Sequence, residues 1–245
     1  MAIVWQHNKG STRYEVRSAG ATRRLYTNGA FHSQHNPHHL FTGGIWDLLV
    51  VPALYFPVKR PKILILGVGG GAAIHLFNQL IDQPDITGIE YDKTHLRIAK
   101  DFFGCNASIA TLIHADAYQW IEQNNGKHHV LLDDLFVDGP DDPVRPKAVN
   151  WQWIKQLSRK LTEDGILIQN HLSPTTARTT ARDAKTRKLF RHALLFHHPR
   201  YANGILALYR RPVDIRHARE ALKQSIKTTY PGELKRLSYR VETLY

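Results

Sequence analysis

A glycine-rich turn and two carboxylates are spaced in this chain as they are in sites that bind a nucleoside. Residues 67–71 hold four glycines in five positions, and Glu90 and Asp116 follow at the ends of two later apolar segments. Glycine lets the backbone approach a ligand, and an acid about twenty residues further on can accept hydrogen bonds from ribose hydroxyls. The predicted cofactor-binding residues are Gly67, Gly69, Gly70, Gly71, Glu90 and Asp116.

The turn lacks the features of two common phosphate-binding loops. The third glycine of the dinucleotide fingerprint is missing from its place, and the Lys-Ser or Lys-Thr pair of a P-loop does not follow. A ligand with a ribose but without a phosphate fits this turn. An S-adenosyl sulfonium compound is therefore the predicted cofactor class.

Acidic residues are concentrated in one short segment, although the net charge of the chain is +12. This segment contains Asp133, Asp134, Asp138, Asp141 and Asp142. Crowded carboxylates can hold a cation and raise one another's pKa. A carboxylate can also remove the proton of an amine, whose lone pair then attacks a carbon next to a sulfonium. We predict Asp134 as this base, Asp138 as its orienting partner and Asp133 as a substrate-binding residue, with an acidic surface loop as the alternative.

The elements that would position these residues alternate between strand and helix from residue 62 to about 211. Apolar runs predict strands near 62–66, 86–90, 110–113, 129–134 and 165–170, and helices near 72–81, 93–102, 115–124, 148–160 and 180–192. Two more strands, 193–197 and 204–209, would close the sheet as a hairpin. We predict an α/β fold with a doubly wound, mostly parallel sheet of about seven strands.

Different patterns flank this central part and divide the chain into three predicted regions. Residues 1–35 alternate and turn like antiparallel β, and 40–54 resembles a helix. The tail is basic and begins as a helix over 215–226. The predicted regions are an N-terminal β-meander and helix (1–56), a nucleoside-binding α/β domain (57–212) and a basic, helical C-terminal extension (213–245).

Composition excludes some classes of protein. Cys105 is the only cysteine, so the chain has no internal disulfide, and no apolar run approaches the length of a membrane span. We expect a cytoplasmic protein. The 33 basic and 21 acidic residues would suit a nucleic acid, but a well-solvated basic surface is the favoured alternative. The basic residues after the fifth predicted strand are Arg178, Arg182, Lys185, Arg187, Lys188 and Arg191.

Four histidines crowd the loop that follows the N-terminal region: His32, His35, His38 and His39. Such a cluster can bind a metal, but no nearby Cys or Asp completes a ligand set, and Pro37 prevents a regular helical face. A polar connecting loop is therefore the favoured interpretation, and no metal is predicted.

Taken together, the motifs resemble those of the spermidine synthase (aminopropyltransferase) family over about residues 13 to 211. Residues 25–33 resemble its Leu-Asp-Gly-x-x-Gln-Ser signature, and residues 67–72 its Gly-Gly-Gly-Asp-Gly-Gly turn. Residues 90–92 are similar to its Glu-x-Asp motif, and residues 115–116 to the Gly-Asp pair whose carboxylate receives the adenine amine. Residues 130–134 are similar to the strand that ends in the catalytic-loop aspartate.

The resemblance implies a methyltransferase-like Rossmann fold, a decarboxylated S-adenosylmethionine cofactor and the transfer of an aminopropyl group to a small cationic amine. It also implies a homodimer or homotetramer that assembles through the N-terminal region. In the family, a glutamine that gates the substrate occupies the position of His32, which makes His32 a predicted substrate-binding residue.

Several positions depart from the family pattern. Gly70 replaces an aspartate that helps to hold the amine of the decarboxylated cofactor, Asn28 replaces the signature aspartate, and residues 43–46 replace a Tyr-His-Glu segment. Three functions therefore remain open. They are aminopropyl transfer, which we favour, methyl transfer from S-adenosylmethionine to a small molecule or RNA, and non-catalytic nucleoside binding.

Overall fold

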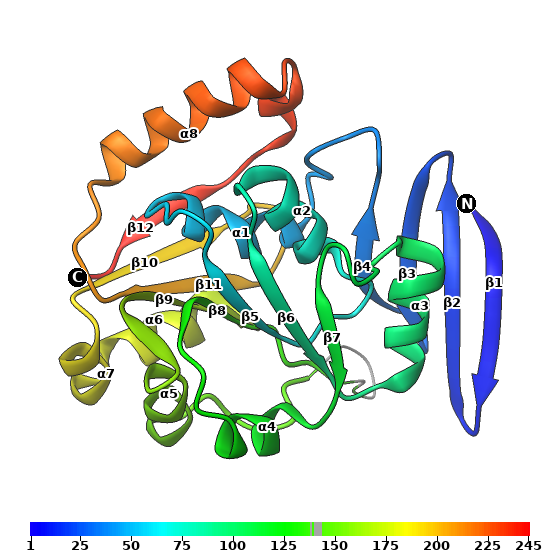
Figure 1. Ribbon diagram of the computed structural model, residues 1–245, viewed down its shortest axis with the longest axis horizontal. Coiled ribbons are helices and arrows are strands. Elements are labelled where there is room, and N and C mark those ends of the chain that lie inside the picture. Colours follow the sequence, from blue (N-terminus) through cyan, green and yellow to red (C-terminus); the bar gives the residue numbers. More distant parts are fainter. Residues whose placement is uncertain (138, 140–143) are drawn as a thin grey trace.

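Two β-sheets organise the chain in the computed structural model, which describes residues 1–137, 139 and 144–245 (Figure 1). The smaller sheet is N-terminal and antiparallel, and its strands follow one another in chain order. They are β1 (Ala2–Lys9), β2 (Thr12–Ala19), β3 (Thr22–Thr27) and β4 (Ala30–His35). Asn28 and Gly29, with φ of 49° and 86°, make the turn between β3 and β4. The predicted N-terminal antiparallel β region is confirmed.

The larger sheet has the order β12-β10-β11-β9-β8-β5-β6-β7. Neighbours among β5 to β9 pair in parallel, whereas β10, β11 and β12 are antiparallel additions at one edge. The strands are β5 (Lys62–Leu66), β6 (Asp85–Glu90), β7 (Thr111–His114), β8 (His128–Asp133), β9 (Leu161–His171), β10 (His192–His197), β11 (Gly204–Tyr209) and β12 (Arg240–Thr243). The predicted mostly parallel α/β sheet is confirmed, with one strand more than expected.

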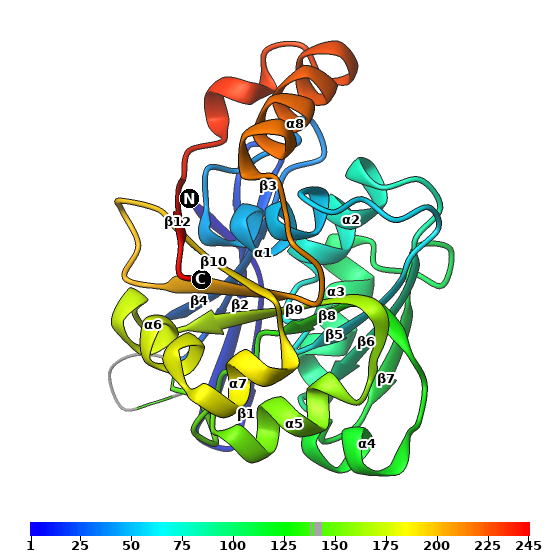
Figure 2. The same ribbon diagram turned by 90° about the vertical axis from the view of Figure 1, so that its left-hand side faces the viewer.

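Helices cover both faces of this sheet (Figure 2). Strand β5 shows why, because Ile63 and Ile65 belong to one buried cluster while Leu64 and Leu66 belong to the other. On the first face pack α1 (Ile45–Leu54), α2 (Ala72–Leu80) and α8 (Ile215–Thr229), and α3 (Lys93–Phe103) also reaches β3. On the second face pack α4 (Ala117–Gln123), α5 (Trp151–Ser158), α6 (Pro174–Arg182) and α7 (Ala184–Leu189).

Two predicted elements differ from those observed. The single helix predicted over 180–192 is wrong: Asp183 separates α6 from α7 and caps α7 by accepting from the backbone N–H groups of Lys185 and Thr186. The tail is not only helical. After α8 and a short 3-10 helix (Glu233–Arg236), it returns as β12, which pairs antiparallel with β10.

Candidate functional site

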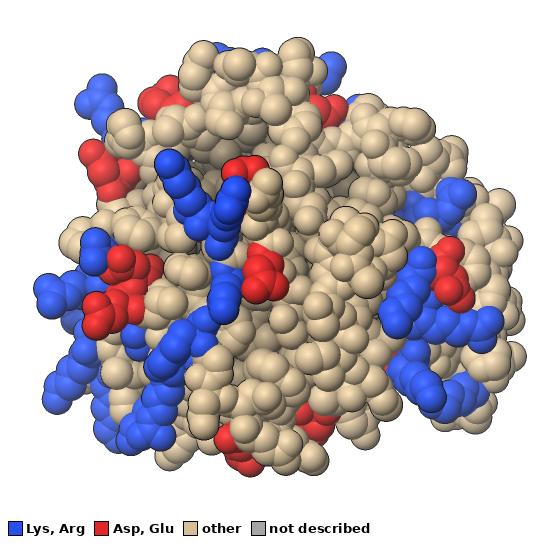
Figure 3. All heavy atoms as spheres, in the orientation of Figure 1, with Lys and Arg blue, Asp and Glu red and all other residues tan. Residues whose placement is uncertain are grey.

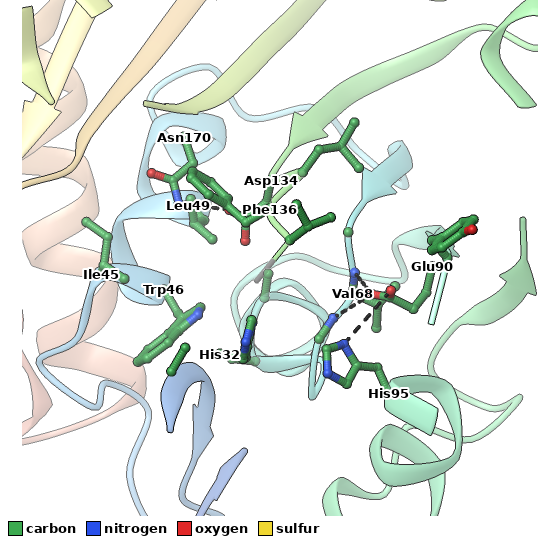
Figure 4. A pocket seen from close by; sticks show the side chains of 18 of the residues that line it. His32, Ile45, Trp46, Leu49, Val68, Glu90, His95, Asp134, Phe136 and Asn170 are labelled. Atoms are coloured by element: carbon green, nitrogen blue, oxygen red, sulfur yellow. Dashed lines mark hydrogen bonds and ion pairs between the residues drawn. The ribbon is translucent and has the colours of Figure 1, made fainter. Parts of the chain in front are cut away.

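A cavity of about 910 Å³ opens where the carboxyl ends of the parallel strands face the N-terminal sheet and α1. The residue after β8, Asp134, lies in the middle of the view in Figure 4. Glu90 and His95 lie on one side of it, and Ile45 and Trp46 on the other. The cavity therefore joins the predicted cofactor-binding edge of the sheet to α1.

Glu90 ends β6 and binds the glycine turn. Its Oε2 accepts from the backbone N–H groups of Val68 at 2.9 Å and Gly69 at 3.0 Å, and its Oε1 accepts from that of Asp92 at 2.9 Å. A carboxylate offers about four acceptor positions. Glu90 lines the cavity and is mostly buried, so about one position is left for a ribose hydroxyl rather than the two that a bidentate contact needs.

Replacing Glu90 by glutamine is expected to weaken both the turn and the binding of a nucleoside. The amide nitrogen of glutamine cannot accept, and each hydrogen bond to a charged group contributes about 1.5–3 kcal/mol. We expect a melting temperature about 5 °C lower and at least a roughly tenfold loss of affinity for 5′-methylthioadenosine, the nucleoside part of the predicted cofactor. Thermal melting and calorimetry measure the two effects.

The matched control for this variant is Glu122→Gln, at an exposed position on α4. It should leave both quantities unchanged. A Glu90→Gln protein that binds the nucleoside like wild type would remove Glu90 from the site.

Glycine is required at position 67 because the chain after β8 passes close to the turn. Gly67 has φ of 86°, and a Cβ at this position would overlap the carbonyl oxygen of Asp134. The backbone N–H of Asp134 also donates to the carbonyl of Leu66 at 2.9 Å. Gly67 thus lets Asp134 approach the place where a cofactor would contact the turn.

The other glycines of the turn are placed differently. Gly69 lines the cavity together with Gly67, whereas Gly70 and Gly71 do not. A Cβ at Gly70 would lie 2.9 Å from the Cβ of Ser33 and 3.0 Å from the ring of Phe103. Gly70 therefore has no room for the aspartate that stands at this position in the spermidine synthase family.

Asp116 has two roles in the structure. Its Oδ1 caps α4 by accepting from the backbone N–H groups of Tyr118 at 2.7 Å and Gln119 at 3.3 Å, and the residue also lines the cavity. Because both capping bonds go to one oxygen, helix capping is compatible with binding a ligand. Tyr91 and Tyr118 line the same end of the cavity and offer flat apolar surface for a base.

Asp134 faces the cavity and belongs to a chain of hydrogen bonds. Its Oδ1 accepts from Asn170 Nδ2 at 2.8 Å, and Asn170 Oδ1 accepts from Asn203 Nδ2 at 3.0 Å. Burial raises the pKa of Asp134 to about 6, and the neighbouring carboxylates of Asp133 and Glu90 add to this increase. A carboxylate with a pKa near the working pH suits a general base.

Asp133 points away from the cavity and is completely buried. Its Oδ1 accepts from Arg145 at 2.6 Å, and its Oδ2 accepts from Trp153 Nε1 at 3.0 Å and Gln169 Nε2 at 2.9 Å. Burial alone would raise the pKa of Asp133, but these three donors outweigh it and hold the pKa below its ordinary value. The structure therefore shows Asp133 in a core network rather than among the residues that line the cavity.

This network reaches the site through Arg145, whose Nη1 donates to the backbone carbonyl of Asn170 at 2.8 Å. Arg145 thus links Asp133 to the residue that holds Asp134. The predicted orienting residue Asp138 lies outside the described residues, as do Asp141 and Asp142.

The four histidines of the predicted loop do not converge. His32 lines the cavity with its ring 5.3 Å from that of His95, His35 stacks on His75 at 3.9 Å, and His39 Nδ1 lies 3.0 Å from Glu233 Oε1. Within the described part of the chain, no group of three or more His, Cys, Asp or Glu side chains could hold a metal ion.

Sequence reasoning missed three groups of cavity residues. The first group is Asn170, near the end of β9, and Asn203, just before β11. The sequence did contain a signal for these two residues, because side chains at the carboxyl end of a parallel strand and next to it often belong to a ligand site. The second group is His95, which forms a hydrogen bond of 2.8 Å with Thr27 Oγ1 and lies 4.0 Å from Glu90 Oε1. The contact with Thr27 joins α3 to the N-terminal sheet, and nothing in the sequence indicates it. The residues of α1 form the third group.

The charge of the cavity is opposite to that of the surface. Glu90, Asp116 and Asp134 line it, and no Lys or Arg is found among its described lining residues. In Figure 3 the Lys and Arg side chains gather in two groups, one that runs from the region of β10 and β12 down to α6 and α7, and one over the N-terminal sheet and α3. Two of the basic residues of α6 and α7 are already engaged, since Arg178 pairs with Glu242 at 2.7 Å and Arg187 lies over the ring of Tyr245.

Solved structures similar to this one include spermidine synthases and a methyltransferase-like protein. A probable spermidine synthase from Corynebacterium glutamicum superposes with a TM-score of 0.74 at 17% identity, covering 99% of this chain and 91% of the other. The fold is that of the spermidine synthases. The Thermotoga maritima enzyme gives a TM-score of 0.66 at 13% identity, covering 87% of this chain and 74% of the other.

The same architecture extends to a human protein. Methyltransferase-like protein 13, solved in complex with SAH, gives a TM-score of 0.58 at 19% identity and covers 76% of this chain and 89% of the other. A spermidine synthase solved with the transition-state analogue AdoDATO gives a TM-score of 0.68 at 14% identity, covering 87% of this chain and 75% of the other.

Neither the models of known protein families nor the curated proteins include a match to the sequence. Among the described helices, none is long and apolar enough to cross a membrane.

Proposed function

We propose that this chain is a divergent spermidine-synthase-like transferase that moves an aminopropyl group from decarboxylated S-adenosylmethionine to an amine. The observation that carries the proposal is the charge of the cavity. Three carboxylates line it, without a described Lys or Arg, in a chain of net charge +12. Decarboxylated S-adenosylmethionine has a sulfonium and an ammonium group but no carboxylate, so its charge complements this lining.

The backbone of the glycine turn supports the same cofactor. A carboxylate of a ligand is often held by free N–H groups of a turn or helix N-terminus. Here the N–H groups of Val68 and Gly69 both donate to Glu90. A cofactor with its carboxylate intact would have to compete with Glu90 for these two donors.

In the proposed reaction, Asp116 receives the adenine amine and Glu90 a ribose hydroxyl. The sulfonium cofactor supplies an activated carbon next to sulfur. Asp134 removes a proton from the ammonium group of the acceptor, and the nitrogen lone pair then forms a bond to that carbon while the carbon–sulfur bond breaks. The products are 5′-methylthioadenosine and the aminopropylated amine, with the proton on Asp134. Asn170 keeps the carboxylate of Asp134 oriented toward the cavity.

Calorimetry with the two cofactors tests the proposal. The decarboxylated form is expected to bind at least about tenfold more tightly than S-adenosylmethionine, because a ligand carboxylate near Glu90 and Asp134 meets like charge. Release of 5′-methylthioadenosine in the presence of amines then measures turnover. Tighter binding of S-adenosylmethionine would overturn aminopropyl transfer.

Gly70 favours a second candidate, methyl transfer from S-adenosylmethionine. The aspartate that the family has at this position would repel the carboxylate of S-adenosylmethionine. Here that position is Gly70, where an aspartate side chain would not fit, so this repulsion is absent. In that case S-adenosylhomocysteine would be the nucleoside product, and the acceptor could be a small molecule or RNA.

Assembly through the N-terminal sheet is also part of the proposal. Strand β1 forms the free edge of this sheet, and Ile3 and Val4 are 49% and 46% exposed there. An unpaired edge with exposed apolar side chains can pair with a second copy of the chain.

A further inference from the structure

Beyond Asp134 the cavity ends in a wall of apolar side chains. Phe31 comes from β4, and Ile45, Trp46 and Leu49 come from α1. The rings of Phe31 and Trp46 meet edge to face with their centroids 4.6 Å apart. Figure 4 shows Ile45, Trp46 and Leu49 on the side of Asp134 opposite to Glu90. We call these four residues the α1 wall.

The α1 wall is held in place before any ligand arrives. Asp47, in the first turn of α1, accepts from the backbone N–H groups of Gly43 at 2.7 Å and Thr42 at 3.3 Å. Glu233 of the C-terminal tail accepts from the backbone N–H of Phe41 at 3.1 Å and contacts His39 at 3.0 Å. The segment that leads into α1 is therefore fixed from two sides, which lowers the entropic cost of binding against it.

No Lys, Arg, Asp or Glu belongs to the described residues at this end of the cavity. A diamine whose first nitrogen lies at Asp134 would place its second ammonium group against the α1 wall. Removing an ammonium group from water without a paired charge is costly. A contact with the face of Trp46 returns only about 0.5–2 kcal/mol. An alkyl or aryl group at the same place would gain free energy from burial.

We propose that the α1 wall is a subsite for the apolar body of the acceptor, which is an amine with one nitrogen and an alkyl or arylalkyl chain rather than a diamine. The inference rests on the proposed function, since the nitrogen of this amine is the one that reacts at Asp134. It names the class of acceptor, and it separates the chain from enzymes whose acceptor has a cation at both ends.

The test compares amines that differ only at the distal end. Hexylamine, 2-phenylethylamine and 1,6-diaminohexane are titrated calorimetrically into the protein, both with and without saturating 5′-methylthioadenosine. We expect hexylamine and 2-phenylethylamine to bind at least about tenfold more tightly than the diamine. Equal or tighter binding of the diamine overturns the inference, and so does the absence of binding by all three amines.

Two variants and a control link the preference to the α1 wall. Trp46→Ala should reduce the affinity for 2-phenylethylamine about tenfold or more, because the main apolar contact is lost. Ile45→Glu should reverse the preference in favour of 1,6-diaminohexane, because it places a carboxylate in the α1 wall where the second ammonium group would lie. Trp120→Ala, on α4 and outside the cavity lining, should leave the amine affinities unchanged. Thermal melting shows that each variant is folded, and an unaltered preference in folded Ile45→Glu would refute the assignment.

Failure of the subsite and failure of the proposed function give different results. If 5′-methylthioadenosine does not bind, the proposed transferase is wrong, while the amine titrations without nucleoside still decide whether the subsite prefers apolar amines. If the nucleoside binds and the diamine is preferred, the transferase proposal stands and the α1 wall is not the acceptor subsite.

Discussion

Replacing Asp134 by asparagine is expected to abolish transfer and, at the same time, to stabilise the protein at pH 7.5. The loss of activity follows from the role of Asp134 as the base that removes the acceptor's proton. General bases contribute about 10²–10⁴-fold to a rate. The gain in stability follows from the environment of the carboxylate, which is more favourable for the neutral form.

The sign of the stability change follows from the direction of the pKa shift. Burial raises the pKa of Asp134 from 3.8 to about 6, so the folded state holds its proton at a pH where the unfolded state has lost it. The folded state is therefore destabilised as the pH rises from about 4 to about 6, and the penalty stays constant above this window. A pKa change of this size corresponds to about 2–3 kcal/mol. Because Asp134 faces the cavity and keeps some contact with water, we expect a penalty of about 1–2 kcal/mol.

Asparagine removes this penalty and keeps an oxygen that can accept from Asn170. The melting temperature of Asp134→Asn is expected to rise by about 4 °C at pH 7.5 and to match that of wild type below pH 4. The turnover of wild type should fall as the pH decreases through about 6, because protonated Asp134 cannot act as a base.

Melting curves and the rate of 5′-methylthioadenosine release measure the two effects. Asp101→Asn, at an exposed position on α3, is the matched control and should change neither. A variant that keeps the rate of wild type would show that another group accepts the proton. A lower melting temperature at pH 7.5 would show that the carboxylate is stabilised in the folded state.

Most of the sheet could be predicted because its strands are buried on both faces and appear as short apolar runs. Residues 62–66 illustrate this, since all but the first residue of β5 are buried. Strand β12 gives no such signal: Arg240, Glu242 and Thr243 surround a single apolar residue, Val241. It forms only because β10 offers a free edge, a tertiary effect that local propensity does not contain.

That Glu90 and Asp116 lie at one edge of the sheet was predictable because position in the chain determines position in the sheet. Glu90 is the last residue of β6 and Asp116 comes two residues after the end of β7, and the carboxyl ends of such parallel strands meet at one edge of the sheet. The sequence did not show which of the neighbouring residues Asp133 and Asp134 faces the cavity. Successive residues of a strand point to opposite faces, so one of the two had to face the cavity and the other the opposite layer. Both faces of β8 are buried, so the sequence alone does not show which face opens to the cavity.

The second large effect is expected for Asp133→Ala, which should strongly destabilise the fold. Arg145 and Asp133 are both buried, with side chains 8% and 0% exposed. Removing one partner of a buried ion pair typically costs about 3–5 kcal/mol, because the remaining charge is left in the interior. Trp153 Nε1 and Gln169 Nε2 would lose their acceptor as well. We expect a melting temperature lower by about 10 °C.

The chain contains its own matched control in a second Arg–Asp pair. Arg211 and Asp164 are 59% and 36% exposed, and exposed pairs contribute about 0–1 kcal/mol. Asp164→Ala should therefore leave the melting temperature nearly unchanged. Because the pKa of Asp133 lies below its ordinary value, the difference between the two variants should be complete above about pH 4 and shrink at lower pH, where the carboxylate of wild type becomes protonated. Similar melting temperatures for both variants at pH 7.5 would mean that Asp133 does not fix the position of Arg145. Arg145 would then not fix the backbone of Asn170, whose side chain orients the carboxylate of Asp134.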